Sequence, residues 1–160
     1  MSSINFTYQI LKLSTDFYDA YPHEKYPEIL LKRERSYNCL LLESHYGYFI
    51  CIPYRSEINH PYAFKFKGTK RSKRHSSGLD YTKIIIIKDT RYFDNSPAII
   101  DKDEFLKTER FIKRIRNEAL NYIETYINHI QNTAPVDVAE YKRKYSKSTL
   151  PYFHKELGID

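Results

Sequence analysis

The sequence contains little cysteine. Cys39 and Cys51 are the only two cysteines in 160 residues, and both lie within apolar runs. Two cysteines cannot build the disulfide framework of a small secreted domain. We therefore expect both to be reduced and buried, and the chain to be cytoplasmic. No group of cysteines and histidines has the spacing of zinc ligands, so neither a metal nor another cofactor is expected.

Long apolar stretches and leader signals are also missing. The isoleucine run Ile84–Ile87 is far too short to cross a membrane. The segment Met1–Asn5 has neither a basic region nor an apolar region after it, so we expect no signal peptide. These absences argue against a membrane protein.

Aromatic residues are abundant: the chain has 16 tyrosines and 9 phenylalanines, but no tryptophan. A tyrosine ring can pack in a core while its hydroxyl stays at the surface, where it can bond a phosphate. Most of these rings are expected to be core and rim residues. The hydrophobic share of 41% excludes a wholly disordered chain. The length suits one domain over residues 1–160.

Two periodicities divide the chain. Alternating apolar and polar residues, or short apolar runs, predict strands at Ile4–Leu13, Tyr37–Glu43, Tyr48–Tyr54, Tyr62–Lys67, Leu79–Lys88 and Ile99–Ile100. A short helix is expected between Ser14 and Pro22. Helical spacing begins after Asp101, which forms a capping-box pattern with Glu104, and recurs over Val136–Tyr145 and after Ser148. Strands followed by helices predict an α+β fold with an antiparallel sheet and a mostly helical C-terminal half.

The net positive charge is concentrated in one segment. The chain has 26 basic and 20 acidic residues, a formal net charge of +6. Six cations and no acid lie in Lys65–His75, namely Lys65, Lys67, Lys70, Arg71, Lys73 and Arg74. Such a surface attracts polyanions over roughly 8 Å at physiological salt. We predict that this basic segment, including His75, binds RNA; the alternative is a solvated charged loop.

A loop after the second strand of the predicted hairpin carries the best candidates for chemistry. Arg55 suits phosphate recognition, Ser56 can bond a phosphate oxygen, and His60 is a candidate general acid or base. A plain capped turn explains the same residues, since turns favour them. The glycine-containing loop 68–78 lacks P-loop spacing, so nucleotide binding of that kind is not expected.

Further cations and one aromatic residue extend the predicted RNA surface. Lys32 and Arg33 precede the hairpin, while Tyr81 and Lys83 follow the basic segment, with Tyr81 expected to be exposed for base contact. Another basic cluster near the C-terminus contains Lys142, Arg143, Lys144 and Lys147. No pair of carboxylates and no Ser-His-Asp or Cys-His motif stands out. The available groups suit metal-independent phosphoryl transfer within RNA, in which cations stabilise the developing charge.

The order of these motifs resembles the toxins of type III toxin–antitoxin systems, the ToxN/AbiQ/CptN superfamily, and most closely the CptN-like members. The resemblance covers most of the chain. It depends on the strand Tyr37–Glu43, the segment Ile52–Ser56, the run Ser77–Ile84 and the helical region that follows.

This resemblance implies a compact, twisted antiparallel sheet or partial barrel of the MazF/ToxN type, surrounded by helices. It implies an endoribonuclease that leaves a 2′,3′-cyclic phosphate and acts against phage. It also implies inhibition by a repeated RNA antitoxin, folded as a pseudoknot and assembled with the toxin into a closed ring.

The family's site residues match only in part. Arg35 takes the place of a lysine before the first hairpin strand, Ser56 matches a serine, and Arg55 replaces a threonine. Ile58 stands where those members have a further lysine, so His60, Lys65 or Lys67 would have to supply the missing group. The predicted catalytic set is therefore Arg35, Arg55, Ser56 and His60. A non-catalytic RNA-binding protein that uses the same basic face is the main alternative, and a DNA- or protein-binding regulator is a further one.

Overall fold

The computed structural model describes residues 8–31, 37–96, 98–133 and 137–159. Its strands are β1 (Tyr8–Leu13), β2 (Cys39–Glu43), β3 (Phe49–Arg55), β4 (Ala63–Lys65), β5 (Gly78–Asp80), β6 (Ile85–Ile87) and β7 (Phe93–Asp94). Its helices are α1 (Thr15–Ala20), α2 (Ser72–His75), α3 (Lys102–Arg110), α4 (Ile112–Ile130), α5 (Val138–Tyr145) and α6 (His154–Leu157). Short 3₁₀ turns cover Tyr81–Lys83, Thr90–Tyr92 and Leu150–Phe153. The predicted α+β class, with strands first and helices last, is confirmed.

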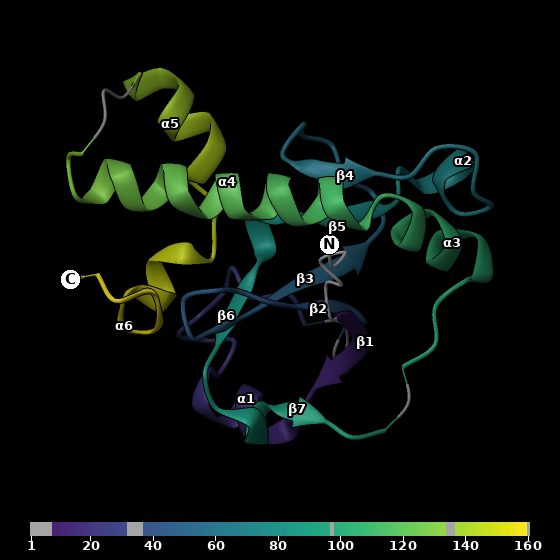
Figure 1. Ribbon diagram of the computed structural model, residues 1–160, viewed down its shortest axis with the longest axis horizontal. Coiled ribbons are helices and arrows are strands. Elements are labelled where there is room, and N and C mark those ends of the chain that lie inside the picture. Colours follow the sequence, from purple (N-terminus) through teal and green to yellow (C-terminus); the bar gives the residue numbers. More distant parts are fainter. Residues whose placement is uncertain (1–7, 32–36, 97, 134–136, 160) are drawn as a thin grey trace, which may run out of the picture.

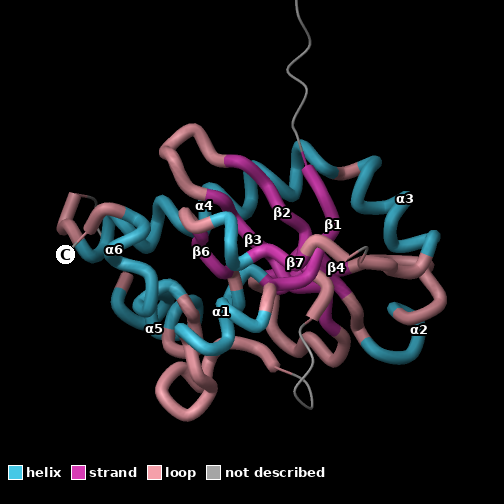
Figure 2. The backbone as a smooth tube through the Cα atoms, turned by 90° about the horizontal axis from the view of Figure 1, so that it is seen from below, coloured by secondary structure: helices cyan, strands magenta, loops and turns pink. Residues whose placement is uncertain are grey.

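The strands form one antiparallel sheet in the order β4-β5-β3-β2-β1-β7, with β6 also paired to β3. In the described part of the chain this sheet does not close into a barrel. Figure 1 shows α4 crossing the sheet, with α1 and β7 at the opposite end of the molecule. In the view from below, the strands lie at the centre, with helices on either side (Figure 2). None of the helices in the described ranges is long and apolar enough for a membrane span.

The predicted hairpin is confirmed as β2 and β3. Its register pairs Leu40 with Ile52 and Leu42 with Ile50, and all four side chains are buried. Cys39 and Cys51 lie on these two strands and are buried, as expected. Burial raises the pKa of the Cys39 thiol to about 12, so this cysteine is a packing residue and not a reactive one.

The predicted continuous strand Leu79–Lys88 is wrong. β5 and β6 both pair with β3: Leu79 pairs with Tyr54, and Ile85 pairs with Cys51. Residues 80–84 therefore have only Ile52 and Pro53 opposite them on β3, and they bulge out of the pairing. Pro53 of β3 explains the interruption. The Tyr54 amide donates to Asn38 on the β2 side, so the Pro53 nitrogen faces the bulge, and proline has no N–H to donate there. We call residues 80–84 the bulge.

Two other strand predictions need correction. Ile99–Ile100 is not a strand, and the Ile99 side chain is 83% exposed; β7 pairs with β1 instead. The predicted strand Tyr62–Lys67 shortens to β4, although its alternation is confirmed, since Phe64 and Phe66 are buried and Lys65 is exposed. The loop after it contains the single turn α2.

The helical spacing predicted after Asp101 is confirmed as two helices, α3 and α4, which are separated at Phe111. The Asp101 side chain makes no capping bond, so the predicted capping box does not form. On α4 the buried hydrophobic residues recur at helical spacing and face the sheet: Ile115, Ala119, Tyr122, Ile123 and Tyr126. Asp137 caps the N-terminus of α5, and its carboxylate accepts a hydrogen bond from the Glu140 amide. Tyr145 of α5 packs on Tyr122 and Tyr126, which places the C-terminal basic cluster beside α4.

Candidate functional site

The end of β3 and the bulge together hold a buried ionic cluster. The Arg55 Nη1 atom lies 2.9 Å from Asp80 Oδ2, and His60 Nε2 lies 3.2 and 3.3 Å from the two Asp80 oxygens. The Asp80 side chain is fully buried, while those of Arg55 and His60 are 27% and 24% exposed. Two segments distant in sequence, the end of β3 with the loop after it and the bulge, therefore meet at one carboxylate.

Asp80 is held in its charged form by its neighbours. Burial by itself raises the pKa of this carboxyl, but hydrogen bonds from His60, Thr82 and Arg55 outweigh burial, so the pKa lies below its ordinary value. The Thr82 amide and hydroxyl both donate to Oδ1, at 2.9 and 2.6 Å. The bulge thus supplies both the carboxylate and two of its donors.

His60 is engaged through both ring nitrogens. Its Nδ1 accepts a hydrogen bond from the Tyr62 amide at 3.1 Å, which leaves Nε2 to donate to Asp80. The ring also stacks on Tyr62, with centroids 5.9 Å apart. In this arrangement His60 orients Asp80, and it can accept a proton only after one of these bonds breaks.

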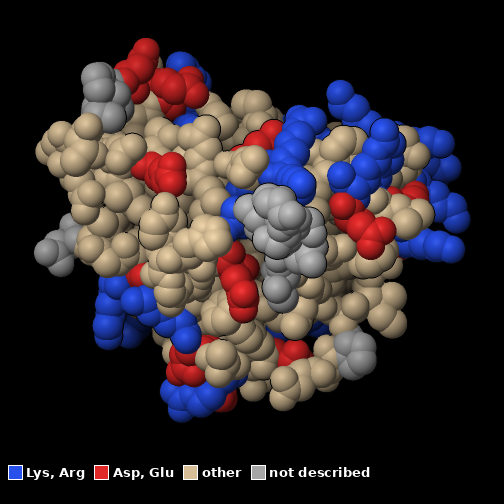
Figure 3. Space-filling view, viewed as in Figure 1, with Lys and Arg blue, Asp and Glu red and all other residues tan. Residues whose placement is uncertain are grey.

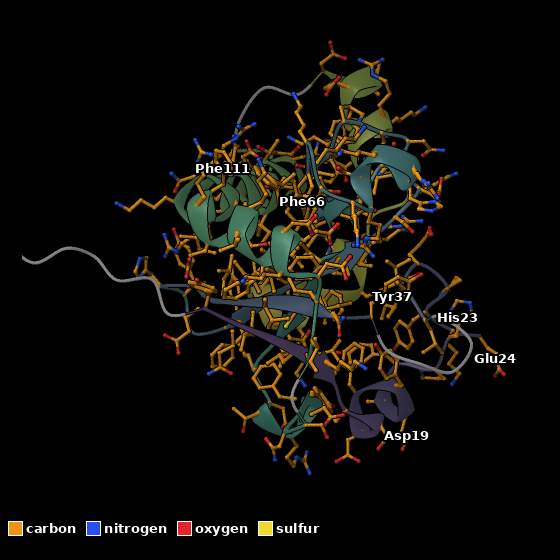
Figure 4. All side chains as sticks on the ribbon, turned by 90° about the vertical axis from the view of Figure 1, so that its right-hand side faces the viewer. Asp19, His23, Glu24, Tyr37, Phe66 and Phe111 are labelled. Carbon is orange, nitrogen blue, oxygen red and sulfur yellow. The ribbon has the colours of Figure 1, made fainter. Side chains whose placement is uncertain are left out.

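Arg55 and Ser56 open onto a cavity of about 370 Å³, which we call the Ser56 cavity. Tyr37, Asn38 and Arg71 also line it. Figure 4 shows this side of the molecule, with Tyr37 between Phe66 and the loop of His23 and Glu24. Among the described residues, the Ser56 hydroxyl has no hydrogen-bond partner, and it is therefore available to a ligand.

The chemistry open to this pair is phosphate recognition. An arginine has five N–H donors in a fixed fork. One of the Arg55 donors, on Nη1, bonds the Asp80 carboxylate, and this hydrogen bond orients the guanidinium. The remaining donors and the Ser56 hydroxyl can bond the oxygens of a phosphodiester. No group of three or more His, Cys, Asp or Glu side chains suited to a metal ion occurs within the described ranges.

The basic segment Lys65–His75 lies along one side of the molecule. Lysine and arginine gather where β4, α2 and α3 lie (Figure 3). The exposed members are Lys65, Lys67, Lys70, Lys73, Arg74 and His75. His75 Nδ1 lies 2.6 Å from Glu57 Oε1, which anchors α2 to the loop after β3. The segment therefore continues the surface that begins at Ser56.

Arg71 differs from its neighbours. Its Nε and Nη2 atoms donate to the two oxygens of Glu104, at 3.2 and 2.9 Å. The Glu104 side chain is buried and also accepts a bond from the Ser77 hydroxyl at 2.7 Å. Arg71 thus fastens α2 to α3, although it still lines the Ser56 cavity.

Two predicted RNA contacts do not lie as expected. The Tyr81 ring is only 4% exposed, and its hydroxyl donates to Glu118, so the prediction of an exposed base contact is wrong. Lys83 is 8% exposed, and its Nζ donates to Glu28 Oε1 and to the Lys147 carbonyl. The bulge causes both results, because it turns these residues inward.

Three predicted residues lie outside the described ones: Lys32, Arg33 and Arg35. Conversely, sequence reasoning missed Asp80 and Glu104, the two buried carboxylates that orient Arg55 and Arg71. For Asp80 a signal was present, since an Asp two residues before a Thr is a common turn-capping pair. For Glu104 no local signal identifies the partner, which lies 33 residues away in sequence.

Comparisons with protein-family models, with curated proteins and with solved structures found no match to this chain.

Proposed function

We propose that this protein is a metal-independent endoribonuclease toxin of a type III toxin–antitoxin system. The observation that carries the proposal is the pair Arg55 and Ser56, a fixed guanidinium next to a hydroxyl without a partner among the described residues, at the mouth of the Ser56 cavity. The basic segment adjoins this pair and can hold the RNA backbone. The open antiparallel sheet is compatible with a fold of the MazF/ToxN type, which we include in the proposal.

The reaction would proceed within the RNA strand. A ribose 2′-oxygen attacks the adjacent phosphorus and loses its proton, and the bond to the 5′-oxygen breaks with a proton returning to that oxygen. The products are a 2′,3′-cyclic phosphate and a 5′-hydroxyl. Arg55 stabilises the charge on the phosphate oxygens, and Ser56 donates to one of them. His60, Lys65 and Lys67 are the candidates for proton transfer, and the pH profiles of their variants would assign that role.

As partners we propose substrate RNA and a repeated RNA antitoxin folded as a pseudoknot, which together with the toxin forms a closed ring. The same basic surface would serve both RNAs. Inhibition then follows from occupancy of the Ser56 cavity by the antitoxin, and release of the toxin would act against phage.

Cleavage of RNA by the purified protein in EDTA tests the proposal, with detection of cyclic phosphate ends. We expect Ser56→Ala and Arg55→Lys to lower the rate by about 100-fold or more while the fold persists. Lysine keeps the charge beside Asp80 but lacks the fork. Ser96→Ala is the matched control, because Ser96 is exposed and does not line the Ser56 cavity. Full activity in both site variants would reject the site.

A second candidate function is non-catalytic RNA binding. One observation favours it: Arg55 and His60 are both engaged with Asp80, which suits a rigid binding surface better than proton transfer. The same experiment separates the two functions. RNA that stays intact while bound, in the wild-type protein and in the Ser56→Ala variant alike, supports the binding protein.

A further inference from the structure

A second cavity lies on the other side of Arg55. It has a volume of about 480 Å³ and is bounded by the bulge, by the loop that carries His60, and by the end of α5 with the residues after it. We call it the Lys147 cavity. Its volume falls within the range of roughly 300 to 1,000 Å³ that is usual for ligand sites. Arg55 is the residue that lines both cavities among those described, so it lies between them.

The lining of the Lys147 cavity is strongly cationic. Arg55, Lys83, Arg143, Lys144 and Lys147 line it, whereas Glu28 is the only carboxylate among its described lining residues. Two more carboxylates lie behind it, since Asp80 pairs with Arg55, and Glu140 pairs with Arg143. An excess of positive charge remains after these pairs are counted.

Lys147 is the cation best placed for a ligand. It is exposed, and it forms no ion pair with any residue in the described ranges. Lys83, by contrast, is paired with Glu28, and the Lys144 Nζ lies over the rings of Tyr122 and Tyr145, at 5.7 and 5.5 Å from their centroids. The Lys83 Nζ donates to the Lys147 carbonyl at 2.8 Å, which fixes the Lys147 backbone against the bulge.

An aromatic pair lies beside these cations. Tyr62 lines the Lys147 cavity and stacks on His60, and its hydroxyl donates to Glu140 of α5 at 3.3 Å. Cations next to an accessible ring fit a nucleotide of a single strand, which offers a phosphate and an unstacked base together. A duplex is too wide for a cavity of this volume.

We propose that the Lys147 cavity is a second phosphate site for single-stranded RNA, on the far side of Arg55 from the Ser56 cavity. Lys147 and Arg143 contact one phosphodiester, and Tyr62 supports the neighbouring base. The inference rests on the proposed function, because it extends the path of the same RNA strand. It gives Arg143 and Lys147 of the C-terminal basic cluster a role in RNA binding.

The test measures the affinity of 2′-O-methyl RNA oligonucleotides of increasing length, which this chemistry cannot cleave, by fluorescence anisotropy in EDTA. For Lys147→Ala we expect the affinity for longer oligonucleotides to fall about fivefold, as for the loss of one solvent-accessible ion contact. The slope of log affinity against log salt should fall by about 0.7. The shortest oligonucleotides, which fill only the Ser56 cavity, should bind as they do to the wild-type protein.

Lys142→Ala is the matched control, because Lys142 is exposed on α5 shortly before Lys147, carries the same charge and does not line the cavity. If both variants bind long oligonucleotides equally well, the second phosphate site is rejected, while cleavage at Ser56 by the wild-type protein still stands. If the wild-type protein neither binds nor cleaves RNA, both proposals fall. Equal binding of polyglutamate, lost in Lys147→Ala, would identify an acidic protein segment as the ligand and reject RNA.

Discussion

Asp80 carries a negative charge at a position that solvent does not reach. Four donor groups, on Arg55, His60 and Thr82, surround its two oxygens and compensate the charge. Removing the charge leaves those donors without an ionic acceptor. Asp80 therefore links the stability of the bulge to the orientation of Arg55.

We predict that Asp80→Asn lowers the free energy of unfolding by about 2 kcal/mol, because an amide cannot accept from all these donors and turns one N–H toward them. Urea unfolding at neutral pH measures the change. Asp19→Asn, on the exposed end of α1, should change the same quantity by less than about 0.5 kcal/mol. Equal effects of the two substitutions would show that the cluster does not stabilise the fold.

The same carboxylate predicts a dependence on acid. The pKa of Asp80 is lower in the folded protein than in the unfolded chain, so its contribution to stability is complete above about pH 4 and is lost as the pH falls through the folded pKa. Asp80→Asn should therefore reduce the loss of unfolding free energy that the wild-type protein shows as the pH falls below about 4. A variant that loses stability as steeply as the wild-type protein would contradict this assignment.

Among the elements, β5 is short but joins the site to the sheet. All three of its residues pair with β4, and Gly78 and Leu79 also pair with β3; its last residue is Asp80. Gly78 begins the strand at a close approach, because a Cβ atom placed there would lie 2.3 Å from the Phe64 carbonyl oxygen. The backbones of β4 and β5 can meet at this distance only when residue 78 has no side chain.

We expect Gly78→Ala to lower the free energy of unfolding by about 2 to 4 kcal/mol, since backbone atoms must move to admit the methyl group. The shift should also weaken the Arg55–Asp80 pair and reduce RNA binding. Gly47→Ala is the comparison: its φ of +82° carries strain, but nothing surrounds the added atom, so the loss should be about 1 kcal/mol. Thermal unfolding followed by circular dichroism ranks the two variants, and a smaller loss for Gly78→Ala would reject the clash.

Local patterns predicted the elements whose boundaries are set within the segment itself. The β2–β3 hairpin, the short helix α1 and the amphipathic face of α4 follow from alternation, from Ser14 and Pro22, and from helical spacing. The bulge could not be predicted from local patterns, because Ile84–Ile87 has the pattern of an ordinary strand. Pro53, which interrupts the pairing, lies on the neighbouring strand β3. Arg55 and Ser56 were identified from the loop, but Asp80 was missed, because it meets Arg55 across 25 residues of sequence.

At the scale of the whole molecule, many tyrosines pack in or against the core, alongside its isoleucines and leucines. Burial is the first cause that raises the pKa of many tyrosines above the usual value, namely Tyr18, Tyr21, Tyr48, Tyr54, Tyr81, Tyr122, Tyr126 and Tyr145. A buried phenol resists ionisation because its charged form would lose hydration. The fold therefore depends on a set of hydroxyls that stay protonated.

We predict a steep loss of stability in alkali. A raised pKa means that the folded protein keeps a phenol proton that the unfolded chain releases. The contribution of these tyrosines to the free energy of unfolding is therefore fully present below about pH 10 and is lost as the pH rises. Each such tyrosine lowers the free energy of unfolding by about 1.4 kcal/mol per pH unit. Unfolding free energies measured by urea between about pH 8 and pH 11, with phenolate absorbance, give this slope. Burial, with Tyr46 and Glu124 nearby, raises the pKa of Tyr48 to about 12, and Tyr48→Phe keeps the ring. The free energy of unfolding of Tyr48→Phe should fall less steeply with pH than that of the wild-type protein, by about 1.4 kcal/mol per pH unit. An unchanged slope would mean that Tyr48 ionises in the folded protein as it does in the unfolded chain.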